Sequence, residues 1–323
     1  NLQGKIKESI NYFDKAIKIN KYSESYFFKS LIQLKLENFE DGWKNYEWRW
    51  QTKLFLNQKK YFDHKTWDGK QDLKNKTILL YGEQGLGDQI QFIRFANIIK
   101  QLRAKVFIEV DKNLVKLFQE TFYFKNIYAK GDKIPEFQYC CPLMSLPLKL
   151  NINHIKHIPK YSSYLNFNAV RVKRWKDLFE KKKINIGINW ESGSVSMFKG
   201  RSFKLNNFKN ISLLKGVELF SLQKINGLEQ IKENENQFKI NIFKNFDEEA
   251  PFVDTAAIMK NLDLIITSDT SIAHLAGALG KKTFLVLQKN SEWRWLLEKK
   301  KFSLVSKFYY LSSKKRRKLG RSF

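Results

Sequence analysis

A glycine-rich turn that ends in a carboxylate is the first feature of this sequence that could do chemistry. Residues Gly82–Asp88 read GEQGLGD and stand between a predicted strand and a predicted helix. Its glycines, Gly85 and Gly87 among them, permit a tight turn and the close approach of a ligand, although their spacing differs from the dinucleotide fingerprint GxGxxG. Asp88 could cap the helix, or it could act as a general base at a cleft. The residues alone do not decide between these two roles.

A second candidate site lies where a hydroxyl-rich helix begins. Asp269, Thr270 and Ser271 follow a predicted strand and open the next helix. The free N–H groups and the positive dipole end of a helix N-terminus suit a bound diphosphate. His274 follows one turn later on the same side, where a contact with a phosphate or ribose is favoured over a purely structural role. We therefore expect a nucleotide to bind here.

Cationic side chains follow the ends of two further predicted strands. Lys199 and Arg201 stand in the loop after strand Ile184–Trp190, and Lys224 follows strand Val217–Leu222. Such cations could hold a phosphate, although a solvated loop is the alternative. Because the carboxyl ends of parallel strands share one edge of a sheet, the convergence of three strand ends favours an anion site.

Other chemistry has weaker support in the sequence. The four histidines lack metal-ligand spacing and no Asp-x-Asp is present, so we expect neither a bound metal nor a cofactor. Adjacent Cys140 and Cys141 predict core packing, and Asp247–Glu249 predicts a solvated turn. The aromatic cluster Trp293–Leu297 could serve in packing or as a wall of a nucleotide pocket.

Two alternating series of strands and helices must position these residues. A charged stretch, Val170–Lys183, predicts a helix that connects them. The pattern predicts an α/β protein with two Rossmann-like domains facing a cleft, at residues 71–168 and 169–323. The predicted strands are Thr77–Tyr81, Lys105–Val110, Asn126–Ala129, Phe137–Cys141, Ile184–Trp190, Val217–Leu222, Leu264–Thr267 and Thr283–Leu287. The predicted helices are Gln89–Leu102, Leu114–Glu120, Phe208–Lys215, Thr255–Asn261 and Ile272–Leu279.

Residues 1–70 predict a short all-α segment, because apolar residues recur there at helical spacing. The helices expected are Leu2–Ile19, Tyr26–Leu36 and Phe39–Trp50. Aligned at an offset of 33, the segment repeats a small residue, Ser9 or Gly42, with an aromatic four positions later. This pattern resembles the tetratricopeptide repeat. One and a half repeats cannot bury a core alone, so the segment must pack on the next domain or continue upstream.

The charge of this 323-residue chain is strongly positive, at +27, but only ten of its 59 basic residues are arginine. Lysine spread along the whole chain favours a basic cytoplasmic protein over a specific nucleic-acid binder. Attraction to anionic substrates or to the inner membrane face stays open. Two cysteines exclude a disulfide-stapled scaffold, and no apolar run is long enough for a membrane span.

Taken in order, these motifs resemble the family 9 (heptosyltransferase-like) glycosyltransferases with N-terminal tetratricopeptide repeats. The resemblance covers nearly the whole chain and implies a GT-B fold with metal-independent, inverting transfer from a nucleotide sugar. It assigns the base to Asp88 and the basic positions near the phosphates to Arg201 and Lys224. The resemblance assigns donor binding to Asp269, Thr270, Ser271 and His274. The motifs that carry it are Gly82–Asp88, Trp190, Arg201-Ser202, Ser221–Lys224, Asp254–Ala257, Asp263–Gly280 and Trp293–Leu297.

We therefore expect a glycosyltransferase whose acceptor hydroxyl belongs to a protein or a cell-surface glycan. Gly85, Gly87 and Lys199 complete the expected donor-binding set, and the helical segment would hold a protein acceptor. Two alternatives remain at this stage. One is a non-catalytic scaffold of repeats and GT-B domains, and the other is an RNA-binding protein suggested by the charge.

Overall fold

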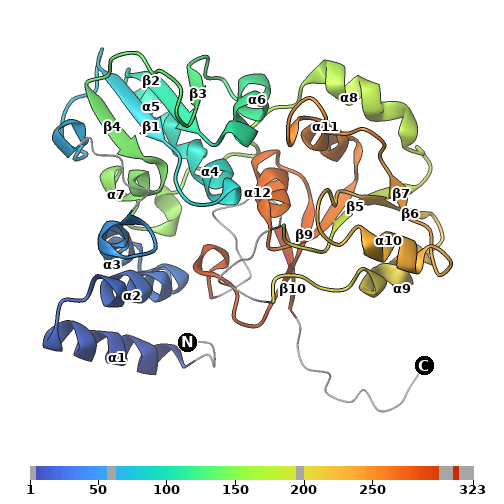
Figure 1. Ribbon diagram of the computed structural model, residues 1–323, viewed down its shortest axis with the longest axis horizontal. Helices are drawn as coiled ribbons and strands as arrows, with labels where there is room; N and C mark the ends of the chain where they lie inside the picture. The colour runs from blue at the N-terminus through green and yellow to red at the C-terminus, as the bar shows by residue number, and fades with distance from the viewer. Residues whose placement is uncertain (1–4, 57–62, 194–199, 298–307, 313–323) are drawn as a thin grey trace.

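The computed structural model describes residues 5–56, 63–193, 200–297 and 308–312. Two α/β units lie side by side, and an all-helical N-terminal segment packs beneath the first of them (Figure 1). Both sheets are parallel, as the alternation of strands and helices predicts. The carboxyl ends of the strands therefore meet along one edge of each sheet.

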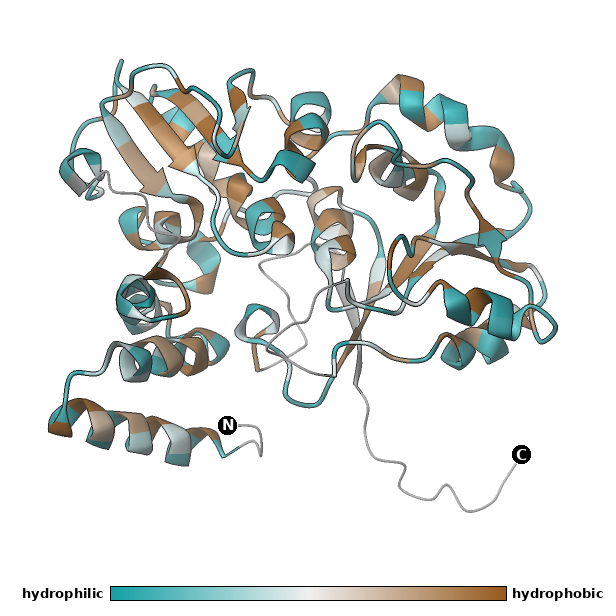
Figure 2. Ribbon diagram, in the orientation of Figure 1, coloured by the Kyte–Doolittle hydropathy of each residue, from teal (hydrophilic) through white to brown (hydrophobic). Residues whose placement is uncertain are grey.

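The first unit contains a four-stranded sheet in the order β3-β2-β1-β4. Its central strands are nearly continuous hydrophobic runs (Figure 2), as expected for strands covered on both faces. The strands are β1 (Thr77–Tyr81), β2 (Lys105–Val110), β3 (Ile127–Ala129) and β4 (Tyr139–Pro142). The helices are α4 (Leu86–Phe92), α5 (Ala96–Gln101), α6 (Lys112–Thr121) and α7 (Leu146–Lys149).

The second unit contains a six-stranded sheet in the order β10-β9-β8-β5-β6-β7. The centre of this sheet is β8 and β5, whose ends lead into the loops of the predicted site. The strands are β5 (Ile184–Asn189), β6 (Val217–Ser221), β7 (Asn241–Ile242), β8 (Leu264–Ser268), β9 (Thr283–Leu287) and β10 (Phe308–Ser312). The helices are α8 (Ala169–Trp175), α9 (Lys209–Ser212), α10 (Glu229–Asn234), α11 (Val253–Asn261) and α12 (Ser271–Ala278).

The N-terminal segment contains α1 (Ile6–Ile19), α2 (Ser23–Lys35), α3 (Phe39–Tyr46) and the 3-10 helix η1 (Glu47–Gln51). Gly42 lets α3 approach α2, because a Cβ at this position would lie 2.7 Å from Cδ2 of Leu34. Trp43 and Phe39 are buried in the same hydrophobic core as the first sheet. The segment therefore shares a core with the α/β part, as its small size requires.

Several predicted elements end elsewhere in the structure. The expected helix Val170–Lys183 is only α8, followed by one 3-10 turn to Leu178. A 3-10 turn at Ile93–Phe95 divides the expected helix Gln89–Leu102 into α4 and α5. The sequence pattern did not indicate α10, because its residues are mostly polar, or β7, because it has only two residues.

The acidic run Asp247–Glu249 is a turn in which Glu248 and Glu249 are exposed, as its composition predicts, but Asp247 is partly buried and bonded to the protein. Asp247 accepts hydrogen bonds from the backbone N–H groups of Asp254 and Thr255, at 2.7 and 3.0 Å. It thereby closes the N-terminus of α11, while burial raises its pKa above the ordinary value. Glu249 forms an ion pair with Arg171. One residue of the run, Asp247, thus fixes the N-terminus of α11.

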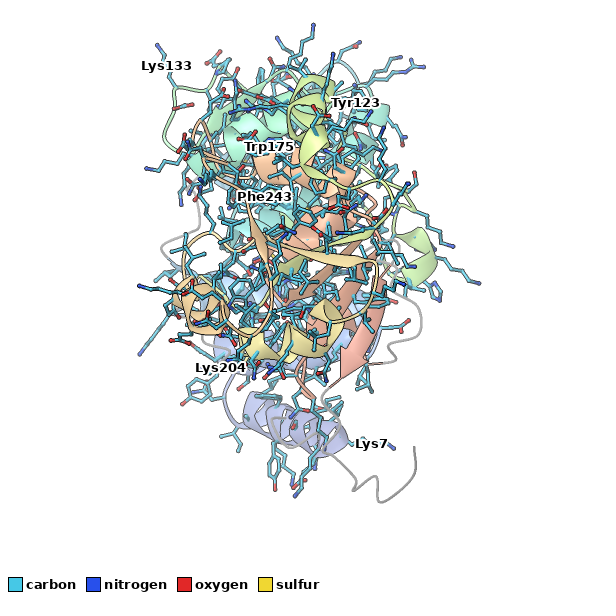
Figure 3. All side chains as sticks on the ribbon, turned by 90° about the vertical axis from the view of Figure 1, so that its right-hand side faces the viewer. Lys7, Tyr123, Lys133, Trp175, Lys204 and Phe243 are labelled. Atoms are coloured by element: carbon cyan, nitrogen blue, oxygen red, sulfur yellow. The ribbon has the colours of Figure 1, made fainter. Side chains whose placement is uncertain are left out.

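Long side chains project around the periphery (Figure 3), whereas large aromatic residues such as Trp175 and Phe243 are buried. Lys7, Lys133 and Lys204 project from three separate places at the periphery. Trp175 and Phe243 meet inside, edge to face, with ring centroids 5.7 Å apart. Among the described residues the positive charge is thus dispersed, which is not the clustered arrangement typical of a nucleic-acid site.

Candidate functional site

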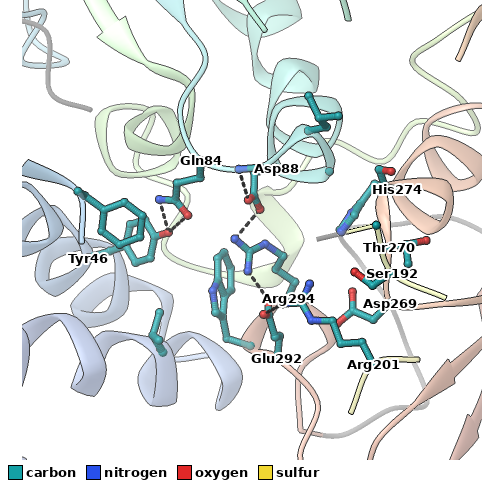
Figure 4. Close-up of a pocket in the computed structure, with 18 of the residues that line it drawn as sticks. Tyr46, Gln84, Asp88, Ser192, Arg201, Asp269, Thr270, His274, Glu292 and Arg294 are labelled. Atoms are coloured by element: carbon teal, nitrogen blue, oxygen red, sulfur yellow. Dashed lines mark hydrogen bonds and ion pairs between the residues drawn. The ribbon is translucent and has the colours of Figure 1, made fainter. Parts of the chain in front are cut away.

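A cavity of about 600 Å³ opens where the helical segment, the glycine-rich turn and the loops of the second unit meet (Figure 4). Its lining combines aromatic and aliphatic side chains with charged and hydroxyl groups. The aromatic and aliphatic residues of the lining are Phe27, Phe28, Leu31, Tyr46, Phe55, Leu86, Ile225, Phe252 and Trp293. The polar residues of the lining are Gln84, Asp88, Ser192, Arg201, Asp269, Thr270, Ser271, His274, Glu292 and Arg294, together with Gly85, Gly87 and Gly193.

The glycine-rich turn connects β1 to α4 and presents Asp88 to the cavity. Gly85 occupies the N-cap position of α4, and Asp88 is the third residue of that helix. One Asp88 oxygen, Oδ2, accepts a hydrogen bond from the Gly85 N–H at 3.1 Å. Asp88 is therefore not itself the cap, as one sequence interpretation had it, but it closes the helix end by reaching back.

Two glycines of the turn are needed for packing. A Cβ on Gly87 would lie 2.6 Å from Cδ2 of His274, so only glycine lets α4 and α12 meet at this point. A Cβ on Gly82 would overlap the side chain of Gln89, whose carbonyl oxygen accepts from the Asp111 N–H. The sequence suggested ligand approach as the reason for these glycines, but Gly82 and Gly87 make room for protein side chains.

The N-terminus of α12 faces the cavity. Thr270 is its N-cap residue, yet the Thr270 side chain makes no capping hydrogen bond. Its hydroxyl donates instead to Oδ1 of Asn189 on β5, at 3.0 Å. The positive end of this helix is thus left available to an anion.

Burial shifts the pKa values of Asp269 and His274, which lie beside this helix end. Asp269 is buried and its pKa is raised, mainly by loss of hydration and against the attraction of Arg201. His274 stacks on Trp295 with centroids 5.2 Å apart, and burial holds its pKa well below the ordinary value. The nearby Arg294 and Arg201 lower it further. His274 is therefore a neutral imidazole that could donate a hydrogen bond but brings no positive charge to a phosphate.

A chain of ion pairs crosses the cavity and connects the two units (Figure 4). Arg294 contacts Oδ1 of Asp88 at 2.5 Å and Oε2 of Glu292 at 2.6 Å. Arg201 pairs with the other oxygen of Glu292 and lies 3.8 Å from Asp269. Both guanidinium groups thus converge on one carboxylate, and both oxygens of Asp88 are engaged.

Sequence reasoning missed Glu292 and Arg294 as site residues. They follow β9 and lie in and beside the 3-10 helix η9 (Trp293–Trp295), far along the chain from Asp88. The aromatic cluster was interpreted as packing or as a pocket wall, and Trp293 does line the cavity. The one signal available was an arginine between two tryptophans after a strand end.

The remaining predicted cations are placed differently. Lys224 does not line the cavity; its ammonium group donates to the backbone carbonyl of Phe246 and lies 4.4 Å from the centre of that ring. Lys199 falls outside the described residues. Of the two predicted cations that the structure describes, Arg201 lines the cavity and Lys224 does not.

Within the part of the chain that the structure describes, no group of three or more His, Cys, Asp or Glu side chains could hold a metal ion. No helix in that same part combines the length and the apolar character needed to cross a bilayer. Cys140 and Cys141 are both buried in the core, and neither is part of a disulfide.

The chain was compared with known proteins. No protein-family model matches it. Protein FlbA of Caulobacter vibrioides is 25% identical over 288 residues, which cover 82% of this chain and 48% of FlbA. The chain therefore spans about half the length of that relative.

Solved structures share the architecture at low sequence identity. The crystal structure of a family 9 glycosyl transferase from Veillonella parvula superposes with a TM-score of 0.58 and 11% identity, over 76% of this chain and 88% of that one. Escherichia coli ADP-heptose LPS heptosyltransferase II gives a TM-score of 0.48 and 10% identity, over 73% and 90%. The first likeness shows that this chain has a glycosyltransferase-like fold, with two parallel α/β units.

Proposed function

We propose that this protein is a glycosyltransferase that moves a sugar from a nucleotide-sugar donor to an acceptor hydroxyl. The observation that carries the proposal is the convergence of Asp88, two arginines and the open N-terminus of α12 on one cavity. A carboxylate can accept the proton of a hydroxyl, and cations with a helix N-terminus can stabilise a leaving diphosphate. The fold shared with a family 9 glycosyl transferase supports the same conclusion.

In the proposed reaction Asp88 takes the proton of the acceptor hydroxyl. The acceptor oxygen then attacks the anomeric carbon from the side opposite the diphosphate, and the bond from that carbon to the phosphate oxygen breaks. Such an in-line displacement inverts the configuration. Arg201, Arg294 and the first turn of α12 would stabilise the charge that develops on the leaving group, so we propose that no metal is required.

Donor binding would have to rearrange the ion pairs. Arg201 and Arg294 both hold Glu292, which stands between them as an anion of the protein itself. We propose that the donor diphosphate competes with Glu292 for these two guanidinium groups. Arg294 would thereby loosen its contact with Asp88 and leave Oδ1 able to accept a proton.

We propose a protein as the acceptor and the helical segment as the part that receives it. The segment supplies Phe27, Phe28, Leu31 and Phe55 to the cavity wall. These side chains offer no hydrogen bonds to a glycan but would contact apolar side chains beside an acceptor hydroxyl. The tetratricopeptide-like pattern of the segment supports this role.

Cellular placement belongs to the same proposal. The two buried cysteines form no disulfide, which favours a reducing compartment, and we propose the cytoplasm. The net charge of +27 supports peripheral contact with the anionic inner face of the membrane.

One observation favours a non-catalytic scaffold as the second candidate. Both oxygens of Asp88 are already bound, one to Arg294 and the other to the Gly85 N–H. Each contact occupies an oxygen that a general base would use to take the acceptor proton. In a scaffold these contacts would persist when a nucleotide binds, and no sugar would be transferred.

A nucleotide screen followed by a transfer assay tests the proposal. Melting temperature is measured for the full chain with ADP, GDP, UDP, CDP and CMP, because a bound ligand raises it by mass action. We expect at least one of them to bind, and the corresponding nucleotide sugar to serve as donor in the presence of EDTA. Binding without any transfer would favour the scaffold. An absolute need for Mg²⁺ or Mn²⁺ would contradict the leaving-group model.

A further inference from the structure

Two consecutive residues of the glycine-rich turn are held by the N-terminal helical segment. Nη2 of Arg49 lies 2.8 Å from Oε1 of Glu83. The Tyr46 hydroxyl is hydrogen-bonded to the side-chain amide of Gln84, at 2.9 Å from its nitrogen and 3.1 Å from its oxygen. The turn that carries Asp88 is therefore fastened from outside its own domain.

The Arg49 contact is fully enclosed. Its guanidinium group is 0% exposed, lies 4.1 Å from the centre of the Trp50 ring, and donates to the Ser145 hydroxyl at 2.7 Å. Glu47 accepts from the same guanidinium group at 2.6 Å. Glu83 is 5% exposed, and burial raises its pKa to about 7 in spite of Arg49. A carboxylate so deeply buried needs its partner, so the position of Glu83 depends on η1.

The same segment also holds the loop that carries Arg294. The buried ammonium group of Lys35, at the end of α2, donates to the Ser291 carbonyl at 2.7 Å. The Leu297 N–H donates back to the Lys35 carbonyl at 2.8 Å. Trp293 packs edge to face on Trp43, with centroids 5.5 Å apart. The turn that carries Asp88 and the loop that carries Arg294 are thus both held by the helical segment.

We propose that the helical segment is part of the active site, with Tyr46 and Arg49 as positioning residues that fix the glycine-rich turn and hence Asp88. Its catalytic consequence rests on the proposed function, whereas the positioning itself does not. Gln84 has a left-handed backbone, with φ of 60°, and lines the cavity itself. Such a conformation is costly for a residue with a side chain, so it persists only where surrounding contacts hold it.

The consequence for catalysis follows from geometry. Misplacement of a reacting group by about 1 Å can lower a rate by roughly 10²-fold. The open N-terminus of α12 and Arg201 belong to the second unit and do not touch Tyr46. Loosening the turn should therefore lower turnover while nucleotide affinity stays nearly constant.

The test compares Tyr46→Phe with a matched control, Tyr26→Phe, in the full chain. Tyr26 lies on the same segment, and its ring stacks on Trp48 with centroids 4.2 Å apart, away from the cavity. Amide hydrogen exchange of residues 82–88 is measured without ligand. We expect faster exchange in Tyr46→Phe, by about tenfold, and no change in Tyr26→Phe. Unchanged exchange in Tyr46→Phe would overturn the proposal, whether or not the chain transfers sugars.

A double-mutant cycle and kinetics extend the test. If the hydrogen bond is the cause, Tyr46→Phe combined with Gln84→Leu should exchange no faster than either single variant. With the donor found by the screen, kcat should fall by about tenfold while KM and the nucleoside diphosphate Kd change by less than about twofold. Arg49→Lys keeps the charge but loses the planar guanidinium fork, so it should also speed exchange in 82–88. Adding Glu83→Gln to Arg49→Lys keeps an acceptor oxygen and should restore part of the lost protection. Additive effects in the cycle would contradict the proposed contact.

Discussion

Two helices begin at the cavity after parallel strands. A side chain closes the N-terminus of one of them, whereas the N-terminus of the other is open. At α4 the end is closed by the protein itself, because Asp88 returns to the N–H of the N-cap residue Gly85. At α12 the N-cap hydroxyl of Thr270 turns to Asn189 and leaves the end open. The same local structure thus yields a fixed carboxylate in one unit and an anion-binding end in the other. The identity of a few side chains decides which role a helix N-terminus takes.

The largest effect should come from placing a negative charge at the open end. Ser271→Glu puts a carboxylate in the first turn of α12, where we propose that the diphosphate binds. We expect calorimetry to show complete loss of binding for the nucleoside diphosphate found by the screen, with the melting temperature nearly unchanged. Ala169→Glu is the matched control, since it adds the same charge to the exposed first turn of α8 outside the cavity. Normal affinity in Ser271→Glu would remove α12 from the donor site.

A smaller effect, of opposite sign, is expected from Glu292. Glu292→Gln removes the charge that competes with phosphate for Arg201 and Arg294 but keeps the shape of the side chain. We expect nucleoside diphosphate affinity to rise by about tenfold, which corresponds to roughly 1.4 kcal/mol. Glu248→Gln, at an exposed position, should leave the affinity unchanged. A weaker affinity in Glu292→Gln would mean that Glu292 supports the site instead of competing for it.

The smallest expected effect concerns the pH dependence of folding stability, through Glu83 in the turn before α4. Burial raises the pKa of Glu83 to about 7 from an ordinary value of 4.5, although Arg49 opposes the shift and Glu47 adds to it. The folded state thus binds an extra proton between these two values. The stabilisation that this proton brings is complete below about pH 4.5 and is lost as the pH rises through about 7. Glu83 also influences Tyr81, Cys141 and Arg49, and the pKa of each of these groups is raised, so Tyr81 and Cys141 stay neutral and Arg49 stays charged throughout.

Melting temperatures of the native chain and Glu83→Gln between pH 5 and pH 8 measure this effect. Glutamine is neutral at every pH, so the native chain should lose a few degrees relative to the variant as the pH rises. A difference that does not vary with pH would show that Glu83 has one charge state across this range. Nucleotide affinity at α12 should not strengthen between pH 8 and pH 6, because the depressed pKa of His274 keeps it neutral.

The α/β part could be predicted from the sequence because its signals are local. Strands β1, β2 and β9 have the predicted bounds, since each is a short apolar run between turn residues. The start of α12 was also predicted, from Thr270 and Ser271 after a strand. The choice between cap and base for Asp88 could not be made, since it depends on Arg294, a residue distant in sequence. The inward-facing helical segment was missed as a cavity wall for the same reason.

The position of a residue at a strand end does not by itself predict where its side chain lies. Arg201 and Lys224 both follow strand ends at the same rim, yet only Arg201 lines the cavity. The Phe246 carbonyl and ring hold Lys224 elsewhere. A sequence indicates that a cation is near the edge of a sheet, but the acceptors close to it decide where its charged group lies.

The central claim is that Asp88 does chemistry beyond closing its helix, and Asp88→Asn tests it most directly. Asparagine can still accept the Gly85 N–H, so a structural role predicts a small loss of stability and near-normal turnover. It cannot accept a proton from the acceptor, so the account predicts a fall in kcat of roughly 10²–10⁴-fold. Nucleoside diphosphate affinity should change by less than about twofold. Asp111→Asn, at the cap of α6 away from the cavity, controls for the substitution itself. Asp88→Asn with normal turnover would contradict the account and leave Asp88 with no role beyond closing the start of α4.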